Sequence, residues 1–292
     1  MDIRAIAMGL AFALMWSSAF ATARIIVADA PPLLSLALRF GLTGLVAITA
    51  ARLMGQDWRL PGGLGGPQAR AVLVFGLCQN ALYLGLNFIA MQWIEASLAA
   101  IITSSMPLIV AGLGWAFRGE RTSARGLAGL AAGMAGVVLI MGSRVQGGAD
   151  TLGIALCILG ALALAVATLT VRGASGTGNL LMVVGLQMLV GCGALALASG
   201  LTEVPQMALS MRWLAAFLYQ CFVPGLAATL LWFGLVRRIG AVRAATFHFL
   251  NPAFGVAIAA ALLGEHVTRT DLIGVAIAMV GILIVQMERG RA

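Results

Sequence analysis

Long runs of apolar residues dominate this chain of 292 residues and restrict what it can fold into. The runs are 16–25 residues long, and about 20 residues of α-helix cross the hydrocarbon core of a bilayer. Hydrophobic residues make up 61% of the chain and charged residues only 10%, which is more apolar than a water-soluble domain of this size requires. We therefore predict an all-α polytopic membrane protein.

We count ten such runs and predict one membrane-spanning helix for each. The runs are Ile3–Val27, Pro32–Met54, Ala69–Met91, Ile94–Phe117, Ala124–Met141, Leu152–Val171, Leu180–Gly200, Trp213–Val236, Ala241–Leu263 and Leu272–Met287. The first run is too long for a signal peptide and carries Trp16 in its middle, so we expect it to remain a helix.

The chain also repeats part of its own sequence. Residues 94–142 align without a gap with residues 239–287, at a constant offset of 145 residues. The shared positions include Pro107 with Pro252, Gly119-Glu120 with Gly264-Glu265, Gly129 with Gly274, Met134 with Met279, and Gly136 with Gly281. Two related halves in an apolar chain are typical of secondary transporters, whose substrate site lies where the halves meet.

Ten helices divide into two repeats of five, and five is an odd number. The second repeat must then enter the membrane from the opposite side, so we predict two inverted five-helix repeats. The boundary is expected in the short polar stretch at residues 143–150, which gives a first repeat of residues 1–147 and a second of 148–292. Glu120 and Glu265 are accordingly expected on opposite sides of the membrane.

The chain carries 18 basic residues, and all of them are arginine. If the amino terminus is cytoplasmic, thirteen arginines fall in cytoplasmic segments or at the cytoplasmic ends of spans, four fall on the opposite side or at the span ends there, and Arg39 lies well inside a span. This bias predicts that both termini are cytoplasmic, in a multi-pass protein of the bacterial inner membrane. The net charge of +8 is therefore a signal of topology, and no nucleic-acid partner is expected.

The composition offers no catalytic or metal-binding pattern. The four cysteines have no paired spacing, and the only histidines are His248 and His266, so we expect no enzyme activity, no cofactor and no metal site. Apart from Glu95 at the very start of the fourth run, no aspartate or glutamate falls within a predicted span, which argues against an acidic proton relay.

Glycines recur on one face of the fifth run and of the tenth. Small residues allow helix backbones to approach closely in a membrane, so we favour packing within one chain over a contact between subunits. The oligomeric state stays open between monomer and homodimer. The glycines concerned are Gly126, Gly129, Gly133, Gly136, Gly274 and Gly281.

A few polar residues fall inside the predicted spans, where an unsatisfied polar group is costly and is expected to face a cavity or another helix. The third run carries four of them at spacings of three and four, which places them on one stripe. Trp16, Thr103, His248 and Asn251 lie at similar depth. The predicted substrate-binding residues are Trp16, Gln79, Asn80, Tyr83, Asn87, Thr103, His248 and Asn251.

Helix-breaking residues mark where these spans could bend. We predict hinges at Pro107, Pro224, Gly225 and Pro252, and Pro252 is expected to free a carbonyl near His248. Hydrophobic walls are expected from Trp16, Phe20, Met106 and Phe247. Trp93, Trp213 and Trp232 lie near span ends and are expected at the membrane interface.

Arg39 has two readings that the sequence does not separate. Its side chain could extend outward to the interface, which we favour, or it could hold the carboxylate of a substrate.

These features together resemble the drug/metabolite transporter superfamily, and within it the EamA-type exporters. The resemblance rests on the two repeats with their ordered prolines and Gly-Glu pairs, on Trp16-Ser17-Ser18-Ala19-Phe20 in the first run, and on Leu38-Arg39-Phe40 in the second. The chain looks most like the YddG-type aromatic amino acid exporters. Gln187 stands where Arg39 would repeat, at an offset of 148, so the halves differ near their centre.

The resemblance and the residues together predict a secondary transporter that exports small amphipathic metabolites, with aromatic or other hydrophobic amino acids first, by alternating access. One alternative is another cargo, such as threonine-like amino acids, purines, methyl viologen, sugars or nucleotide-sugars. A nucleotide-sugar would require several basic residues inside the membrane. The second alternative is a helical accessory protein that transports nothing.

Overall fold

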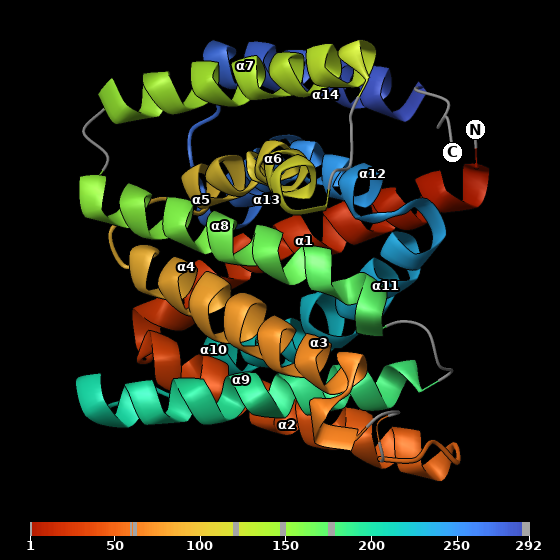
Figure 1. Ribbon diagram of the computed structural model, residues 1–292. Helices are drawn as coiled ribbons and strands as arrows, with labels where there is room; N and C mark the ends of the chain where they lie inside the picture. Colours follow the sequence, from red (N-terminus) through yellow and green to blue (C-terminus); the bar gives the residue numbers. More distant parts are fainter. Residues whose placement is uncertain are drawn as a thin grey trace.

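The computed structural model describes residues 2–58, 60, 63–118, 123–146, 150–174 and 179–287. Within these ranges the regular structure is helical and no strand occurs. The helices lie side by side in layers, from the pair α7 (Ala124–Gln146) and α14 (Arg269–Met287) at one edge to the pair α2 (Pro32–Leu53) and α9 (Leu180–Thr202) at the other (Figure 1).

The remaining helices fill the layers between these two pairs. In the first half they are α1 (Ile3–Asp29), the 3₁₀ turn η1 (Gly63–Gly65), α3 (Pro67–Phe75), the π-helical turn η2 (Gly76–Tyr83), α4 (Leu84–Ala90), α5 (Ala96–Thr103) and α6 (Met106–Arg118). In the second half they are α8 (Thr151–Ala174), α10 (Met211–Gln220), the π-helical turn η3 (Cys221–Ala227), α11 (Ala228–Ile239), α12 (Ala241–Ala245), the 3₁₀ turn η4 (Thr246–Leu250) and α13 (Asn251–Leu263).

Eight helical segments among the described residues are long and apolar enough to cross a membrane. They correspond to the first four and to the sixth through ninth predicted spans. The fifth and tenth predicted spans are helices as well, α7 and α14, but they are not among these eight. The all-helical membrane class is therefore confirmed, while the number of ten spans stays a prediction.

The two halves break their helices at equivalent places. The π-helical turn η2 begins at Gly76 and η3 begins at Cys221, which is again the offset of 145 residues. The span of α5 and α6 is interrupted at Ser104 and Ser105, and the matching span of α12 and α13 is interrupted by η4. Irregular turns within membrane helices often accompany functional sites.

Glycines bring α7 and α14 into backbone contact. A Cβ atom added at Gly136 would lie 2.3 Å from the carbonyl oxygen of Gly274, and one at Gly281 would lie 2.4 Å from the amide nitrogen of Gly133. Only glycine fits such contacts, so the predicted glycine face packs within the chain. Gly136 faces Gly274 while the earlier Gly133 faces the later Gly281, so the two helices are antiparallel.

Reciprocal caps hold the pair α2 and α9. The carboxylate of Glu203, just after α9, accepts hydrogen bonds from the amides of Leu33 and Leu34 at 2.8 and 2.9 Å. The side chain of Gln56, just after α2, accepts from the amide of Met182 at 3.1 Å. Each helix thus ends where the other begins, and each receives an acceptor for its unpaired amino-terminal amides.

Two predicted interfacial tryptophans are buried instead. Trp232 is 1% exposed and stacks on Phe12 of α1, with ring centroids 4.8 Å apart, and Trp213 is 5% exposed beside Phe217. Their prediction as interface anchors was wrong because a position near a span end does not fix which way a side chain points. Trp93 is half exposed, as an interface residue would be.

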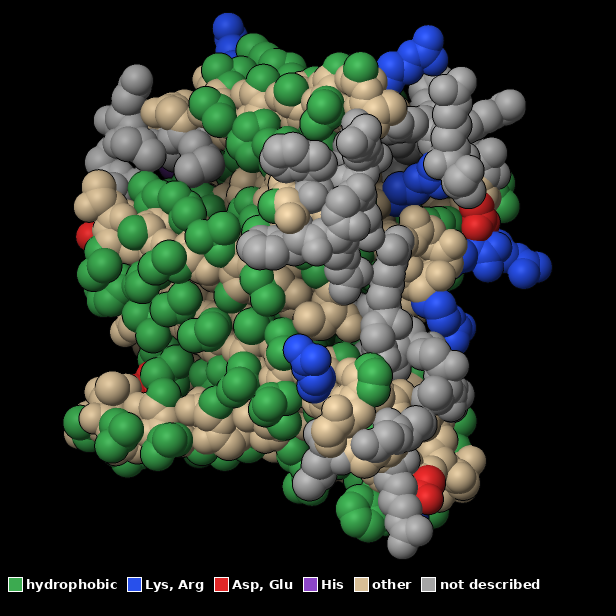
Figure 2. Space-filling view, in the orientation of Figure 1, with side chains coloured by type: hydrophobic (Ala, Val, Ile, Leu, Met, Phe, Trp, Pro, Cys, Tyr) green, Lys and Arg blue, Asp and Glu red, His purple; other side chains and the backbone are tan. Residues whose placement is uncertain are grey.

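Helix α1 begins and α14 ends on the same side of the bundle (Figure 1). Apolar side chains cover most of the face seen in Figure 2, and its basic side chains gather mainly on that same side. Gly119 and Glu120, whose matches are Gly264 and Glu265, lie outside the described residues, as do residues 147–149 at the predicted repeat boundary.

Candidate functional site

A narrow pocket lies between the two halves, with a cavity volume of about 20 Å³. Helices α1 and α2, the turn η2 and helix α4 supply most of its wall, and η3 and α11 of the second half each add one residue. The lining residues are Trp16, Ala19, Phe20, Ala23, Arg39, Phe40, Gln79, Asn80, Tyr83, Leu84, Asn87, Phe88, Met91, Pro224 and Thr229. Ligand sites of small molecules share this mostly apolar character with a few polar groups.

The predicted polar stripe lines this pocket with all four of its members, although the turn that carries three of them is π-helical. Asn87 donates to the carbonyl of Tyr83 at 2.8 Å and accepts from Cys157 at 3.4 Å. Asn80 donates to the backbone carbonyl of Gln187 at 3.0 Å and also to the side-chain oxygen of Gln187. Both asparagine side chains therefore form hydrogen bonds within the protein. The side-chain oxygen of Gln79, in contrast, is buried and accepts no hydrogen bond.

Aromatic rings form the apolar wall. Trp16 and Tyr83 stack with ring centroids 6.0 Å apart and planes within 7° of parallel, and Phe20, Phe40 and Phe88 lie on the same pocket. Met106 and Phe247 do not belong to this wall, contrary to expectation. Phe247 packs instead against Gly9 of α1, where an added Cβ would meet its ring at 2.1 Å.

His248 lies one layer behind Trp16 instead of on the pocket wall. The rings of Phe12, Trp16 and Trp232 surround it at centroid distances of 5.2–5.8 Å. Its Nδ1 atom shares a hydrogen bond of 3.0 Å with the Asn251 amide, and Ser17 donates to the other end of Asn251 at 3.2 Å. His248 is thus not among the residues that line this pocket, and Trp16 packs against both His248 and Tyr83.

Thr103 does not line the pocket but contacts Tyr83, which does. Its hydroxyl lies 3.4 Å from the Tyr83 hydroxyl and donates to the carbonyl of Ala99 at 3.0 Å. Direct substrate contact by Thr103, His248 and Asn251 stays a prediction.

The predicted hinge residues lie at the interruptions of the helices. Pro107 is in the first turn of α6, Pro252 is in the first turn of α13, and Pro224 and Gly225 are inside η3. The carbonyl of His248 is not freed by Pro252, however. It accepts the backbone N–H of Asn251 because η4 is wound as a 3₁₀ turn. The positions fit bending points, and movement at them stays a prediction.

Arg39 is the pocket residue whose position differs most from our preferred interpretation. Its side chain is 3% exposed and lines the pocket, so it does not extend to the interface. Its Nε and Nη1 atoms are buried without a hydrogen-bond partner. A lone charge in the middle of a span was the available signal, and such residues are functional candidates by default.

Comparison with known sequences gives the family. The profile of the EamA-like transporter family matches residues 3–142 and 151–287, which together are nearly the whole chain. The chain belongs to this family. EamA-like transporters are built from two repeats, and the two matched stretches correspond to the two halves of this bundle.

Relatives of this EamA-like transporter carry general names. The uncharacterized transporter YvbV of Bacillus subtilis is 25% identical over 94% of this chain and 89% of its own length. The uncharacterized inner membrane transporter YedA of Escherichia coli is also 25% identical, over 96% of this chain and 90% of its own. These names support a multi-pass inner-membrane transporter and give no support to the narrower YddG-type resemblance.

A solved crystal structure shares the fold of this EamA-like transporter. It superposes with a TM-score of 0.76 and covers 98% of both chains at 21% sequence identity. At this identity the likeness concerns the fold alone.

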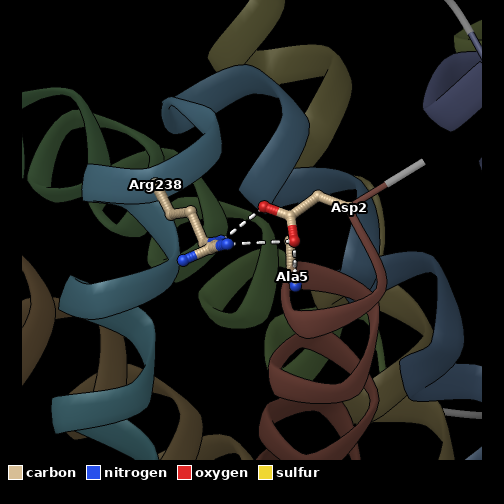
Figure 3. A network of polar contacts seen from close by, with 3 residues as sticks. All are labelled: Asp2, Ala5 and Arg238. Atoms are coloured by element: carbon tan, nitrogen blue, oxygen red, sulfur yellow. Dashed lines mark hydrogen bonds and ion pairs between the residues drawn. The ribbon is translucent and has the colours of Figure 1, made fainter.

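The pocket of this EamA-like transporter lies toward the side of the bundle opposite the amino terminus. Its wall runs along α1 from Trp16 to Ala23, whereas Phe12 and Ala13 before it are fully buried. At the start of α1, Arg238 of α11 points at Asp2 and binds both carboxylate oxygens, one at 3.1 Å (Figure 3). This hydrogen-bonded guanidinium holds the pKa of the Asp2 carboxyl below its usual range. On this side the ion pair thus joins the first helix to α11 of the second half.

Proposed function

We propose that this EamA-like transporter exports small amphipathic metabolites across the bacterial inner membrane, with aromatic and other hydrophobic amino acids first. The observation that carries the proposal is the pocket between the halves, with stacked aromatic rings on one wall and a few amide and hydroxyl groups on another. An aromatic wall favours substrates with an apolar or ring-bearing side chain, and the polar groups fix the other end of such a molecule.

We further propose that transport proceeds by alternating access of two inverted five-helix repeats, with α7 and α14 as the fifth and tenth spans. Three observations support the inversion. The pairs α2 with α9 and α7 with α14 are antiparallel, the helical breaks recur at one offset, and the caps of Glu203 and Gln56 are reciprocal. Antiparallel equivalents are what a pseudo-two-fold axis in the membrane plane produces.

The test is uptake into proteoliposomes that contain the purified protein. We expect labelled phenylalanine to be taken up faster than labelled threonine or a labelled sugar, and to exchange with unlabelled phenylalanine inside. A Trp16→Ala variant removes the ring that stacks on Tyr83 and should slow phenylalanine uptake.

Other results would redirect the proposal. Faster uptake of threonine or the sugar than of phenylalanine would favour the alternative cargoes. No uptake or exchange of any compound, by protein that remains folded, would favour the accessory protein.

A further inference from the structure

Arg39 is a buried cation without an anionic partner. Its Nε and Nη1 atoms have no hydrogen-bond partner, and no carboxylate lies within ion-pair distance of it in the described part of the chain. The nearest aromatic support is the adjacent Phe40 ring, whose centroid is 5.1 Å from the guanidinium carbon. A charge removed from water is normally paired, so the protein alone leaves this one incomplete.

In the second half, the residue at the equivalent position has hydrogen-bond partners. Gln187 of α9 stands at the place that corresponds to Arg39, and it bonds Asn80 in η2 through its carbonyl and its side chain. The residue that corresponds to Asn80 in the second half is Gly225 of η3. A Cβ added at Gly225 would lie 3.4 Å from Nη2 of Arg39, so Arg39 approaches η3 as Gln187 approaches η2. The facing residue, however, has no side chain to offer.

The pocket carries a second incomplete group of opposite character. The side-chain oxygen of Gln79 is buried without a donor, and Gln79 and Arg39 both line the pocket. A guanidinium requires an acceptor such as a carboxylate, which it can bind with two parallel hydrogen bonds. An amide oxygen requires a donor such as an ammonium group.

We infer that Arg39 binds the carboxylate of the transported molecule, while Gln79 accepts a hydrogen bond from its ammonium group. This inference rests on the proposed transport function and specifies the charge of its cargo. An anion or a zwitterion completes the pocket. An amphipathic cation such as methyl viologen meets an uncompensated positive charge instead, because all ten acidic residues of the chain lie outside the spans or at their ends.

Three ligands that share a phenyl group separate these contributions. L-phenylalanine has both charged groups, 3-phenylpropionate has only the carboxylate, and 2-phenylethylamine has only the ammonium. We propose to measure their binding to purified protein in detergent by calorimetry, and their competition with labelled phenylalanine in proteoliposomes. We expect phenylalanine and phenylpropionate to bind and phenylethylamine to bind at least tenfold more weakly than either.

Substitutions then assign the effect to residues. Arg39→Gln should weaken phenylalanine and phenylpropionate about ten- to a hundredfold, the range of a hydrogen-bonded charge. Arg39→Lys keeps the charge but loses the planar fork, so it should fall between that variant and the parent. Gln79→Leu should weaken phenylalanine and leave phenylpropionate unchanged. The matched control is Arg52→Gln, in the same helix, whose exposed side chain pairs with Asp57 at 3.6 Å and should have no effect.

The outcomes separate this inference from the transport proposal. If phenylalanine is transported but Arg39→Gln leaves its affinity and that of phenylpropionate unchanged, the carboxylate contact is wrong and transport stands. Binding of phenylethylamine as tight as that of phenylpropionate overturns the charge selectivity in the same way. If neither carboxylate ligand binds and phenylalanine is not transported, both proposals fail. A thermal unfolding scan of each variant confirms that it is folded.

Discussion

At the scale of single residues, some of the predicted site residues line the pocket and others pack behind those that do. Tyr83 presents its ring to the pocket and stacks on Trp16, and Trp16 in turn packs edge-on against His248. The contacts of His248 are to three aromatic rings and Asn251, so we expect it to support the position of Trp16.

This arrangement predicts different consequences for two substitutions. Tyr83→Phe removes only a hydroxyl, so uptake should fall about five- to thirtyfold, equivalent to 1–2 kcal/mol, with thermal stability unchanged. His248→Ala should reduce stability as well, by about 2–5 kcal/mol, because it leaves a cavity among packed rings. Proteoliposome uptake and thermal unfolding in detergent measure the two effects. Equal stability of His248→Ala and the parent would contradict the packing role.

What the sequence revealed at this scale follows from geometry. The spacing of Gln79, Asn80, Tyr83 and Asn87 placed them on one stripe, and they do line one pocket. The roles of Arg39 and Trp232 were not accessible in this way. The lack of a partner for Arg39 depends on the absence of a side chain at Gly225. The burial of Trp232 depends on the ring of Phe12, more than two hundred residues earlier. Such contacts arise only when helices of both halves pack.

At the scale of helices, hydropathy and glycine spacing were the informative signals. Apolar runs of about 20 residues follow directly from the thickness of the bilayer, and close helix contacts in lipid require residues without a Cβ. The interruptions η2, η3 and η4 were less accessible. Pro224 and Pro252 marked two of them, but no proline lies in η2, whose π-helical winding was not predicted.

The contact of α7 with α14 gives a prediction at this scale. Gly281→Ala should lower the free energy of unfolding by about 1–3 kcal/mol, because the new Cβ would lie 2.4 Å from the backbone of Gly133, which cannot move aside as a side chain can. Gly142→Ala is the matched control, since nothing lies within 4 Å of its added Cβ. Thermal unfolding in detergent measures both, and an equal result for the two variants would show that the glycine contact contributes nothing.

At the scale of the whole molecule, the helix count and the arginine distribution predict one topology. Reporter proteins fused to the amino and carboxy termini should both be active in the cytoplasm, because α1 begins and α14 ends on one side of the bundle and an even number of spans returns the chain to that side. A carboxy-terminal reporter active only in the periplasm would require an odd number of spans and would contradict the two inverted repeats.

With that topology, the side of the bundle at which α1 begins is cytoplasmic. The ion pair of Asp2 with Arg238 joins the first helix to the end of α11, across the two halves. Because the pKa of Asp2 is lowered, the carboxylate remains charged above its unfolded value, and the contact is lost only as the pH falls through the lower folded value. Uptake should therefore not change between pH 6 and pH 8 through this pair, and a change that Asp2→Asn abolishes would contradict this.

The proposed alternating access requires that this side open in each transport cycle, because a substrate bound in the pocket must exchange with the cytoplasm. Linking the two residues should therefore stop transport. A variant with Asp2→Cys and Arg238→Cys is treated with a short bifunctional reagent that forms a disulfide with each thiol. It should lose phenylalanine uptake and regain it when reductant cleaves these disulfides. Each single variant, treated in the same way, controls for modification of the four native cysteines, two of which are buried. Full cross-linking with undiminished uptake would show that α1 and α11 do not separate here during transport.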